Sequence, residues 1–202
     1  PVVGGSPLLS RAPGRVGEYL GVTAARMDAG DAIYAEFADY YIPEDGWDAL
    51  KAELVTTGDW EAVDRAAQPA PTSVLKAQQK TIDHLFGGET LRDVLTDLRH
   101  DGVTVTSREA LKLMGRNAPL SMACAIELVH RVRLRDDIGH ALQTEYRFTY
   151  RAMEKGDFLE GIRAAIIDKD RTPKWQHAAM EDVSPLEVSR MFLPLGTDEL
   201  KI

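Results

Sequence analysis

The chain has 202 residues, of which 44% are hydrophobic and 28% charged, and it carries a formal net charge of −8 at pH 7. The hydrophobic share is large enough to fill the core of a domain, which excludes a chain that is disordered throughout. The negative charge excludes a general nucleic-acid-binding protein, because such proteins need a surplus of Lys and Arg on one face to neutralise phosphates.

The first predicted element is a helix that is interrupted early. Ser6 is expected to be its N-cap, and Pro7 follows at the first helical position, where the missing N–H group of proline is tolerated. The pair Pro13 and Gly14 should break or kink this helix, which can continue from Arg15. The N-terminal segment is therefore expected to contain two helical pieces joined by a turn.

A second group of signals follows before residue 59. Asp28 is a capping acid for another helix, and the run ADYYI at residues 38–42, which stops at Pro43, predicts a short β-strand. An amphipathic helix then begins near Trp47 and ends at Gly58. A lone strand leaves unpaired backbone groups on both edges, so this one would have to pair across an oligomer, pair with residues outside this chain, or stay irregular.

Residues 59–202 show a helical pattern almost throughout, after a proline-containing linker at residues 66–73. Thr106 and Glu109 form a predicted capping box, and Gly115 should end that helix. Further helices follow from apolar residues at helical spacing. These residues are Leu91, Val94, Leu95 and Leu98, then Met122, Ile126, Val129 and Val132, then Ile138, Leu142, Tyr146, Thr149 and Met153.

The segment DFLEGIRAAIIDKDRTPKW combines a helix start, an apolar stripe and a charged end. Asp157 is expected to cap this helix, with Glu160 three residues later, and Ser184 with Glu187 gives one more start signal. The fold is therefore predicted to be mainly α, with one short strand near residues 38–42. The side chains of this segment that are expected to face inward are Phe158, Ile162, Ala165 and Ile166.

Few residues carry a recognisable chemical motif. The histidines show no metal-ligand spacing such as His-Glu-x-x-His, so no metal site is expected, and no nucleophile elbow, Walker loop or Rossmann fingerprint is present. Cys124, the single cysteine, lies in an apolar helical run and is predicted to be a core residue in a reducing compartment rather than a catalytic thiol. The histidines are His84, His100, His130, His140 and His177.

No run approaches the roughly 18 consecutive apolar residues of a membrane-spanning helix. The N-terminal residues show no basic stretch followed by an apolar one, so no secretory signal is predicted. On these grounds we expect a cytoplasmic location, with neither nucleic acid nor membrane among the partners.

The first candidate binding feature is the run VGGS at residues 3–6, which precedes a predicted helix. Helix N-termini carry partial positive charge, so the N–H groups of Gly4 and Gly5 could hold an anion or an oxyanion. Alternatively, the two glycines form only a tight turn. The pattern alone favours the turn.

The second candidate is the basic segment near the C-terminus. Lys169, Arg171 and Lys174 lie within six positions and are followed by Trp175. One interpretation is structural, since cations at a helix C-terminus offset the helix dipole and Pro173 would stop the helix. The other is a ligand site, in which the cations contact phosphates and the indole stacks on an adenine.

Two stretches resemble a known family. The sequence EYRFTYRAMEKGDFLEGIRAAIIDKDRTPKW resembles the C-terminal signature of 3-hydroxyisobutyryl-CoA hydrolases, a branch of the crotonase (enoyl-CoA hydratase/isomerase) superfamily. The first 43 residues, which begin PVVGGSPLLSRAPGRVGEYLG, resemble the segment that follows the catalytic loop in that family. The resemblance implies that residues 1–58 are the tail end of the crotonase core. Residues 59–202 would then be the helical C-terminal region of a crotonase-like α/β fold.

The resemblance also implies which chemistry lies elsewhere. In that family two backbone N–H groups from the N-terminal half hold the thioester carbonyl, and a glutamate that acts on the hydrolytic water precedes the Pro-x-x-Gly-Gly run. We therefore expect no catalytic residue in this chain and no activity from it alone. No separate cofactor is implied, because coenzyme A is part of the acyl-CoA substrate. The candidate substrate-binding residues are Val2, Gly4, Gly5, Lys169, Arg171, Lys174 and Trp175.

One position departs from the family. Its hydrolases carry an acidic residue directly after the proline of the run, where this chain has Val2, and valine cannot accept a hydrogen bond. Three functions stay open: a 3-hydroxyisobutyryl-CoA hydrolase of valine degradation, an enoyl-CoA hydratase or isomerase, and a non-catalytic helical interaction module. Such a module would bind the missing N-terminal half or a second copy of itself.

Overall fold

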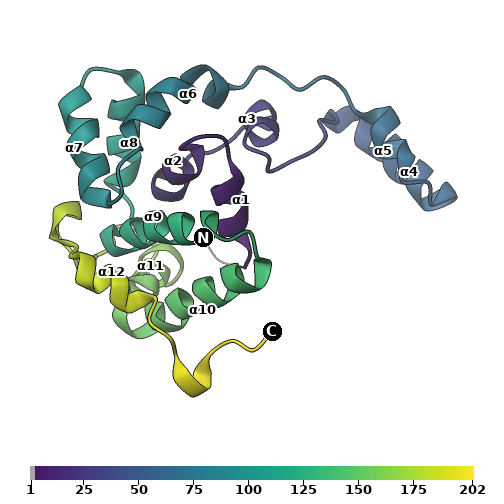
Figure 1. The fold of residues 1–202 in the computed structure, drawn as a ribbon. Helices are drawn as coiled ribbons and strands as arrows, with labels where there is room; N and C mark the ends of the chain where they lie inside the picture. Colours follow the sequence, from purple (N-terminus) through teal and green to yellow (C-terminus); the bar gives the residue numbers. More distant parts are fainter. Residues whose placement is uncertain (1–2) are drawn as a thin grey trace.

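The structure, a computed structural model, describes residues 3–202 and is mainly α-helical, as predicted (Figure 1). Short 3₁₀ turns and one π-helical turn join the longer elements. The α-helices are α1 (Gly5–Arg11), α2 (Val16–Thr23), α3 (Ala29–Tyr34), α4 (Trp47–Thr57), α5 (Glu61–Ala66), α6 (Val74–Leu85), α7 (Leu91–Asp101), α8 (Val105–Met114), α9 (Pro119–Arg133), α10 (Ile138–Lys155), α11 (Phe158–Ile162) and α12 (Pro185–Met191).

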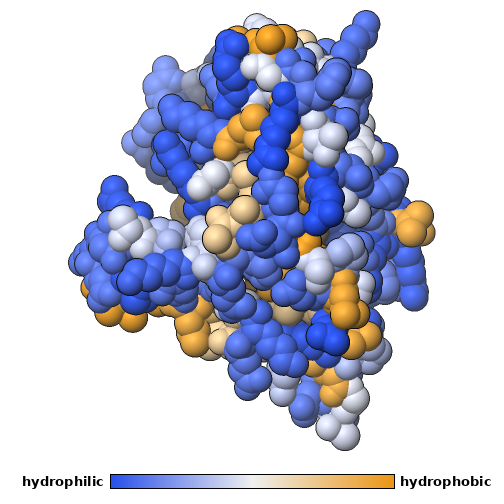
Figure 2. All heavy atoms as spheres, turned by 90° about the vertical axis from the view of Figure 1, so that its left-hand side faces the viewer, coloured by the Kyte–Doolittle hydropathy of each residue, from blue (hydrophilic) through white to orange (hydrophobic). Residues whose placement is uncertain are grey.

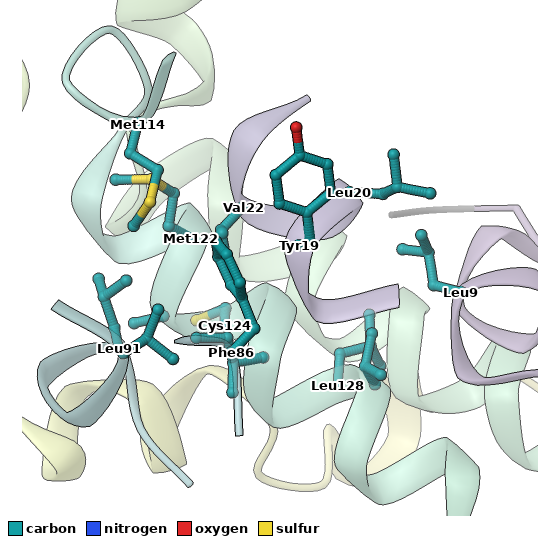
Figure 3. Close-up of a cluster of buried hydrophobic side chains, with 14 of the residues drawn as sticks. Leu9, Tyr19, Leu20, Val22, Phe86, Leu91, Met114, Met122, Cys124 and Leu128 are labelled. Carbon is teal, nitrogen blue, oxygen red and sulfur yellow. The ribbon is translucent and has the colours of Figure 1, made fainter. Parts of the chain in front are cut away.

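Helix α9 is the centre of the fold. It begins at Pro119, buries most of its side chains, and packs against α1, α2, α7, α10 and α12. The core beside it includes Tyr19 of α2 and Phe86, whose rings meet edge to face with centroids 5.2 Å apart (Figure 3). Cys124 lies in this core and is only 2% exposed. The interpretation of Cys124 as a core residue is therefore confirmed.

The N-terminal helix breaks where the sequence indicated, but its start differs. Helix α1 ends at Arg11 and α2 begins at Val16, with Gly14 between them at a positive φ of 54°. Gly4, not Ser6, is the N-cap of α1, with a left-handed φ of 86°. The prediction for Ser6 was wrong because its side chain is fully buried and bonded to another helix.

Two of the predicted N-caps, Asp28 and Ser184, are confirmed. Asp28 accepts the N–H of Asp31 at 2.8 Å, and Ser184 forms a capping box with Glu187. The predicted box at Thr106 was wrong: Thr104 is the N-cap of α8 and accepts the N–H of Ser107. The reason is the carboxylate of Asp101, which accepts hydrogen bonds from the N–H and hydroxyl groups of Thr104 and so starts the helix earlier.

Helices α4 and α5 pack against each other and project from the body as an arm, residues 44–66 (Figure 1). Gly58, with a φ of 65°, ends α4 as predicted. No side chain of α4 is buried. The proposed domain boundary after residue 58 falls between these two helices and stays a prediction.

The predicted strand at residues 38–42 is wrong. Within residues 3–202 this segment forms a single antiparallel bridge, in which the N–H of Gln68 donates to the carbonyl of Tyr41 at 2.8 Å. Pro43 and Pro69 lie close to the paired residues and have no N–H group with which to extend a ladder. Pairing therefore stops after one residue.

The face on the side of α7 and α12 is largely hydrophilic, with hydrophobic side chains exposed in small groups (Figure 2). Across the described residues, no helix combines the length and the apolar character needed to cross a membrane.

Candidate functional site

The glycine turn before α1 is held by a carboxylate from the other half of the chain. The N–H of Gly4 donates to Glu145 Oε2 at 2.7 Å, and the N–H of Ser6 donates to Glu145 Oε1 at 2.8 Å. The hydroxyl of Ser6 donates to the same Oε1 at 2.5 Å. Glu145 lies on α10 and is only 2% exposed. The anion at this helix start is therefore part of the protein itself.

This arrangement limits the backbone N–H groups with which the glycine turn can bind a ligand. The N–H of Gly4, a candidate for anion binding, is already engaged by Glu145. Gly5 opens the first turn of α1 and is half-buried, and Val2 lies outside the described residues. A role of Val2, Gly4 and Gly5 in substrate binding stays a prediction, and the turn itself is rigidly positioned.

The spacing of apolar residues along α10 did not indicate Glu145, because it predicted the wrong inward face for this helix. Ile138 and Met153, expected inside, are 60% and 47% exposed. The buried side chains of α10 are instead small or polar, namely Ala141, Thr144, Glu145 and Ala152. A carboxylate flanked by small residues at helical spacing was the available signal.

The segment after α11 changes its helical period. The N–H of Asp168 donates to the carbonyl of Arg163 at 2.8 Å, which makes residues Arg163–Ile167 a π-helical turn, η2. This wider turn rotates the following side chains relative to an α-helix. The predicted inward face was wrong: Ile166, within this turn, is 65% exposed and Ala164 is buried instead, while Phe158, which precedes the turn, is 52% exposed.

Asp157 does not cap α11. One of its oxygens accepts the N–H of Gln176 at 2.8 Å, so it ties the segment that follows the basic residues to the start of the helix. The other oxygen is buried without a hydrogen-bond partner among the described residues. The prediction of a cap was wrong because the side chain reaches across the loop instead of along the helix.

The residues that follow η2 form a short cation loop, defined as residues 168–174. Lys169, Arg171 and Lys174 are all exposed, and none takes part in an ion pair within residues 3–202. The acidic residues of the loop face Arg163, which donates to Asp168 at 2.6 Å and to Asp170 at 2.7 Å. The loop thus directs its carboxylates toward Arg163 and leaves its cations available at the surface.

Trp175 follows the loop and lies at two adjoining cavities. One has a volume of about 290 Å³ and the other about 270 Å³, and Ala118, Ser121, Phe148 and Trp175 line both. The indole ring packs over Gly161, where an added Cβ would lie 3.7 Å from the ring. The structure therefore brings Trp175 next to the cation loop and places apolar space beside it.

No group of three or more His, Cys, Asp or Glu side chains within residues 3–202 has the geometry to hold a metal ion. Burial raises the pKa of the Cys124 thiol to about 12, so it is not a nucleophile near neutral pH.

Comparison with known proteins gives a consistent assignment. The family model described as enoyl-CoA hydratase/isomerase matches residues 1–192. The chain is 31% identical to "Probable 3-hydroxyisobutyryl-CoA hydrolase 3" of Arabidopsis thaliana, covering 98% of this chain and 56% of that protein. It is 30% identical to the mitochondrial 3-hydroxyisobutyryl-CoA hydrolase of Rattus norvegicus, covering 100% of this chain and 54% of that protein.

Two solved structures also match this chain. A Rhodobacter sphaeroides enoyl-CoA hydratase matches with a TM-score of 0.90 and 47% identity over 100% of this chain and 58% of its own. A Mycobacterium thermoresistibile carnitinyl-CoA dehydratase matches with a TM-score of 0.91 and 33% identity, over 100% of this chain and 57% of its own. The chain spans about half the length of the curated relatives it matches. It belongs to the enoyl-CoA hydratase/isomerase family, of whose crotonase fold it forms a helical C-terminal portion.

Proposed function

We propose that this chain is the C-terminal part of an enzyme that hydrolyses an acyl-CoA thioester, with 3-hydroxyisobutyryl-CoA in valine degradation as the substrate. The observation that carries the proposal is the similarity to proteins named 3-hydroxyisobutyryl-CoA hydrolase over nearly the whole of this chain. Membership of the enoyl-CoA hydratase/isomerase family supports an acyl-CoA substrate.

The cation loop and Trp175 fit a coenzyme A contact. The exposed side chains of Lys169, Arg171 and Lys174 can pair with phosphates, and charge-assisted hydrogen bonds of this kind are the strongest that side chains make. The half-buried indole of Trp175 offers a face on which adenine can stack. These residues would bind the carrier portion of the substrate and take no part in bond breaking.

In the proposed reaction water attacks the thioester carbonyl, and two backbone N–H groups hold the oxygen of the tetrahedral intermediate. A glutamate takes the proton of the water, the C–S bond breaks, and the thiol of coenzyme A leaves as the free acid forms. We propose that these groups belong to polypeptide outside this chain. The 202 residues would then supply positioning and substrate contacts without turnover.

The test compares the chain with its complete reading frame. Sequencing the DNA upstream of the Pro1 codon shows whether an open frame encodes a Gly-rich oxyanion segment and a Pro-Glu pair. The purified complete protein is expected to release free thiol from 3-hydroxyisobutyryl-CoA, and the 202-residue chain is expected to release none above buffer. Clear hydrolysis by the chain alone would show that its catalytic groups lie within it.

Val2 favours a second candidate, an enoyl-CoA hydratase or isomerase. Valine cannot orient water or bond a substrate hydroxyl, and the similar Rhodobacter sphaeroides structure is described as an enoyl-CoA hydratase. The two activities separate in one experiment on the complete protein: hydration removes the enoyl absorbance of crotonyl-CoA, whereas hydrolysis releases a thiol.

The exposed apolar side chains around α11 favour a third candidate, a non-catalytic module that binds the missing half or a second copy. Phe158, Leu159, Ile166 and Ile167 are all more than half exposed, and such groups mark association surfaces. Size-exclusion chromatography with light scattering decides, since a dilute monomer that binds no hydrophobic dye contradicts this candidate. The cytoplasmic location stays a prediction, and the rat relative is named as mitochondrial.

A further inference from the structure

We propose that Arg163 is the positioning residue of the cation loop: it holds the side chains of Asp168 and Asp170 on its guanidinium so that Lys169 and Arg171 face a phosphate-bearing ligand. The inference rests on the proposed function, in which the phosphates are those of coenzyme A. Arg163 itself would not touch the ligand.

The hydrogen bonds of Arg163 account for its whole guanidinium. Such a group has five N–H donors in one plane, and here each has an acceptor. Nε and NH2 donate to the two oxygens of Glu160 at 2.9 and 2.7 Å, and NH1 donates to Asp168 and Asp170 at 2.6 and 2.7 Å. NH2 also donates to the carbonyl of Thr172 at 3.3 Å. An ammonium group, with three donors on one atom, cannot make this set.

The backbone of the cation loop is strained, and the hydrogen bonds of Arg163 stabilise this strained conformation. Lys169 and Arg171 both have a φ of 55°, a left-handed conformation that costs a residue with a side chain about 1 kcal/mol. The strained residues alternate with Asp168 and Asp170, the two that bind Arg163. Without Arg163 the loop would lose the two side-chain hydrogen bonds that favour this alternation.

Backbone bonds fix the remainder of the loop to the same cluster. The N–H of Lys174 donates to Glu160 Oε1 at 2.6 Å, and the N–H of Arg171 donates to the carbonyl of Ala164 at 3.0 Å. The hydrogen bond from Arg163 lowers the pKa of Glu160 to about 2, so its carboxylate is charged at any neutral pH. Glu160 and Arg163 thus hold both ends of the loop.

Charge competition explains why an arginine is needed. Three carboxylates surround Arg163, and three unpaired cations lie within the next eleven residues. If Arg163 did not engage the acids, they would pair with those cations and cancel them, because the attraction between opposite charges at contact exceeds that to a solvent-exposed ligand at greater distance. The cluster therefore keeps the cations free for phosphates.

The test substitutes Arg163→Lys, which keeps the charge and removes the planar donor set. Binding of coenzyme A to the 202-residue chain is measured by calorimetry at low salt, with pantetheine as a probe that lacks phosphates. Amide exchange at Arg171 and Lys174 reports loop order. We expect coenzyme A binding to weaken about tenfold, as for one lost charge-assisted contact, with a smaller salt dependence, faster exchange at both amides, and unchanged pantetheine binding.

Two further variants separate positioning from general destabilisation. Arg65→Lys is the matched control, because Arg65 also bridges two carboxylates, Glu53 at 2.7 Å and Asp59 at 2.8 Å, but lies on the arm; it should bind coenzyme A like the wild type. Lys169→Ala combined with Arg171→Ala should weaken binding without speeding exchange at Lys174.

Unchanged coenzyme A affinity in the Arg163→Lys variant, or unchanged amide exchange, would overturn the inference. A wild-type chain that binds no coenzyme A would instead contradict the phosphate contact in the proposed function, and the exchange data would then show whether Arg163 orders the loop.

Discussion

Glu18 is the residue on which the junction of α2 and α9 depends. Its side chain is fully buried, and a buried carboxylate needs compensating charge and hydrogen bonds. Both oxygens of Glu18 are bonded by Arg133, at 2.5 and 2.9 Å. Arg15 donates to it at 2.8 Å, and His130 lies at 3.1 Å. Because α2 carries the glutamate and α9 the second arginine, this network joins the two helices.

We expect Glu18→Gln to lower the free energy of unfolding by about 3 kcal/mol at pH 7, since it leaves Arg133 partly buried without its counter-charge. Urea unfolding measures the change. The exposed Glu109→Gln variant on α8 is the control and should fall within about 0.5 kcal/mol of the wild type. A loss as small as that of the control would show that the network does not hold the helices together.

The same residue predicts a pH dependence. Burial alone would raise the pKa of Glu18, but hydrogen bonds from His130, Arg133 and Arg15 lower it well below its usual range. A carboxylate with a lowered folded-state pKa stabilises the fold above its unfolded pKa of about 4.3 and loses that contribution as the pH falls. The difference in free energy of unfolding between the wild type and Glu18→Gln should therefore be smaller at pH 3 than at pH 7. An equal difference at both pH values would show that the charge of Glu18 is not the source of its contribution.

At the scale of elements, the contact between α1 and α2 depends on a residue without a side chain. A Cβ added at Gly17 would lie 1.9 Å from the carbonyl oxygen of Leu9, so the two helices touch through their backbones. Helix propensity favours alanine over glycine by about 1 kcal/mol. Here the clash outweighs that gain.

We expect Gly17→Ala to destabilise the protein by about 3 kcal/mol, because the helices must separate. Gly58→Ala is the matched control: nothing lies within 4 Å of its Cβ, and only the positive φ of 65° opposes it, which should cost about 1 kcal/mol. Thermal and urea unfolding of both variants measure the difference. Equal losses of unfolding free energy in the two variants would mean that α1 and α2 can move apart without destabilising the protein.

Elements set by neighbouring residues were predictable, and those set by distant ones were not. Gly58 and Gly115 ended their helices where expected, because a helix stop is local chemistry. The strand at residues 38–42 failed because a strand needs a partner, and among residues 3–202 only Gln68 pairs with it. The inward position predicted for Ile166 was wrong because the π-turn at Arg163–Ile167 changes the helical period, and no local sequence pattern indicates that turn.

In the candidate site, too, some residues could be predicted from the sequence and others could not. The exposed cations of the loop were found from sequence, but the groups that organise them were not recognised. Arg163 could have been found from its spacing of three from Glu160, a favourable helical pair. Glu145 could not have been paired with Ser6, because 139 positions separate them and only the completed fold joins them.

At the scale of the whole molecule, the arm joins the body through the two chain segments that flank it, and these segments meet at the bridge between Tyr41 and Gln68. Ala62 is the one buried side chain described for α4 and α5. Trp47 and Trp60 remain 49% and 69% exposed. The apolar core lies in the other helices, so the body should be stable without the arm.

We expect deletion of residues 44–66, with a two-glycine connection, to change the free energy of unfolding of the body by less than about 1 kcal/mol. The paired residues that flank the arm already bring the ends together. Urea unfolding followed by fluorescence of Trp175 measures it. A loss of several kcal/mol would show that the arm contributes to the core.

The bond between Glu145 and the glycine turn has a consequence for biosynthesis. A ribosome releases the chain from its N-terminus, so Gly4 and Ser6 emerge long before the carboxylate that binds them. Until α10 has left the exit tunnel, the N–H groups of Gly4 and Ser6 lack this carboxylate as their acceptor. The turn is therefore translated well before the helix that fixes it, and it acquires its final geometry only after Glu145 has emerged.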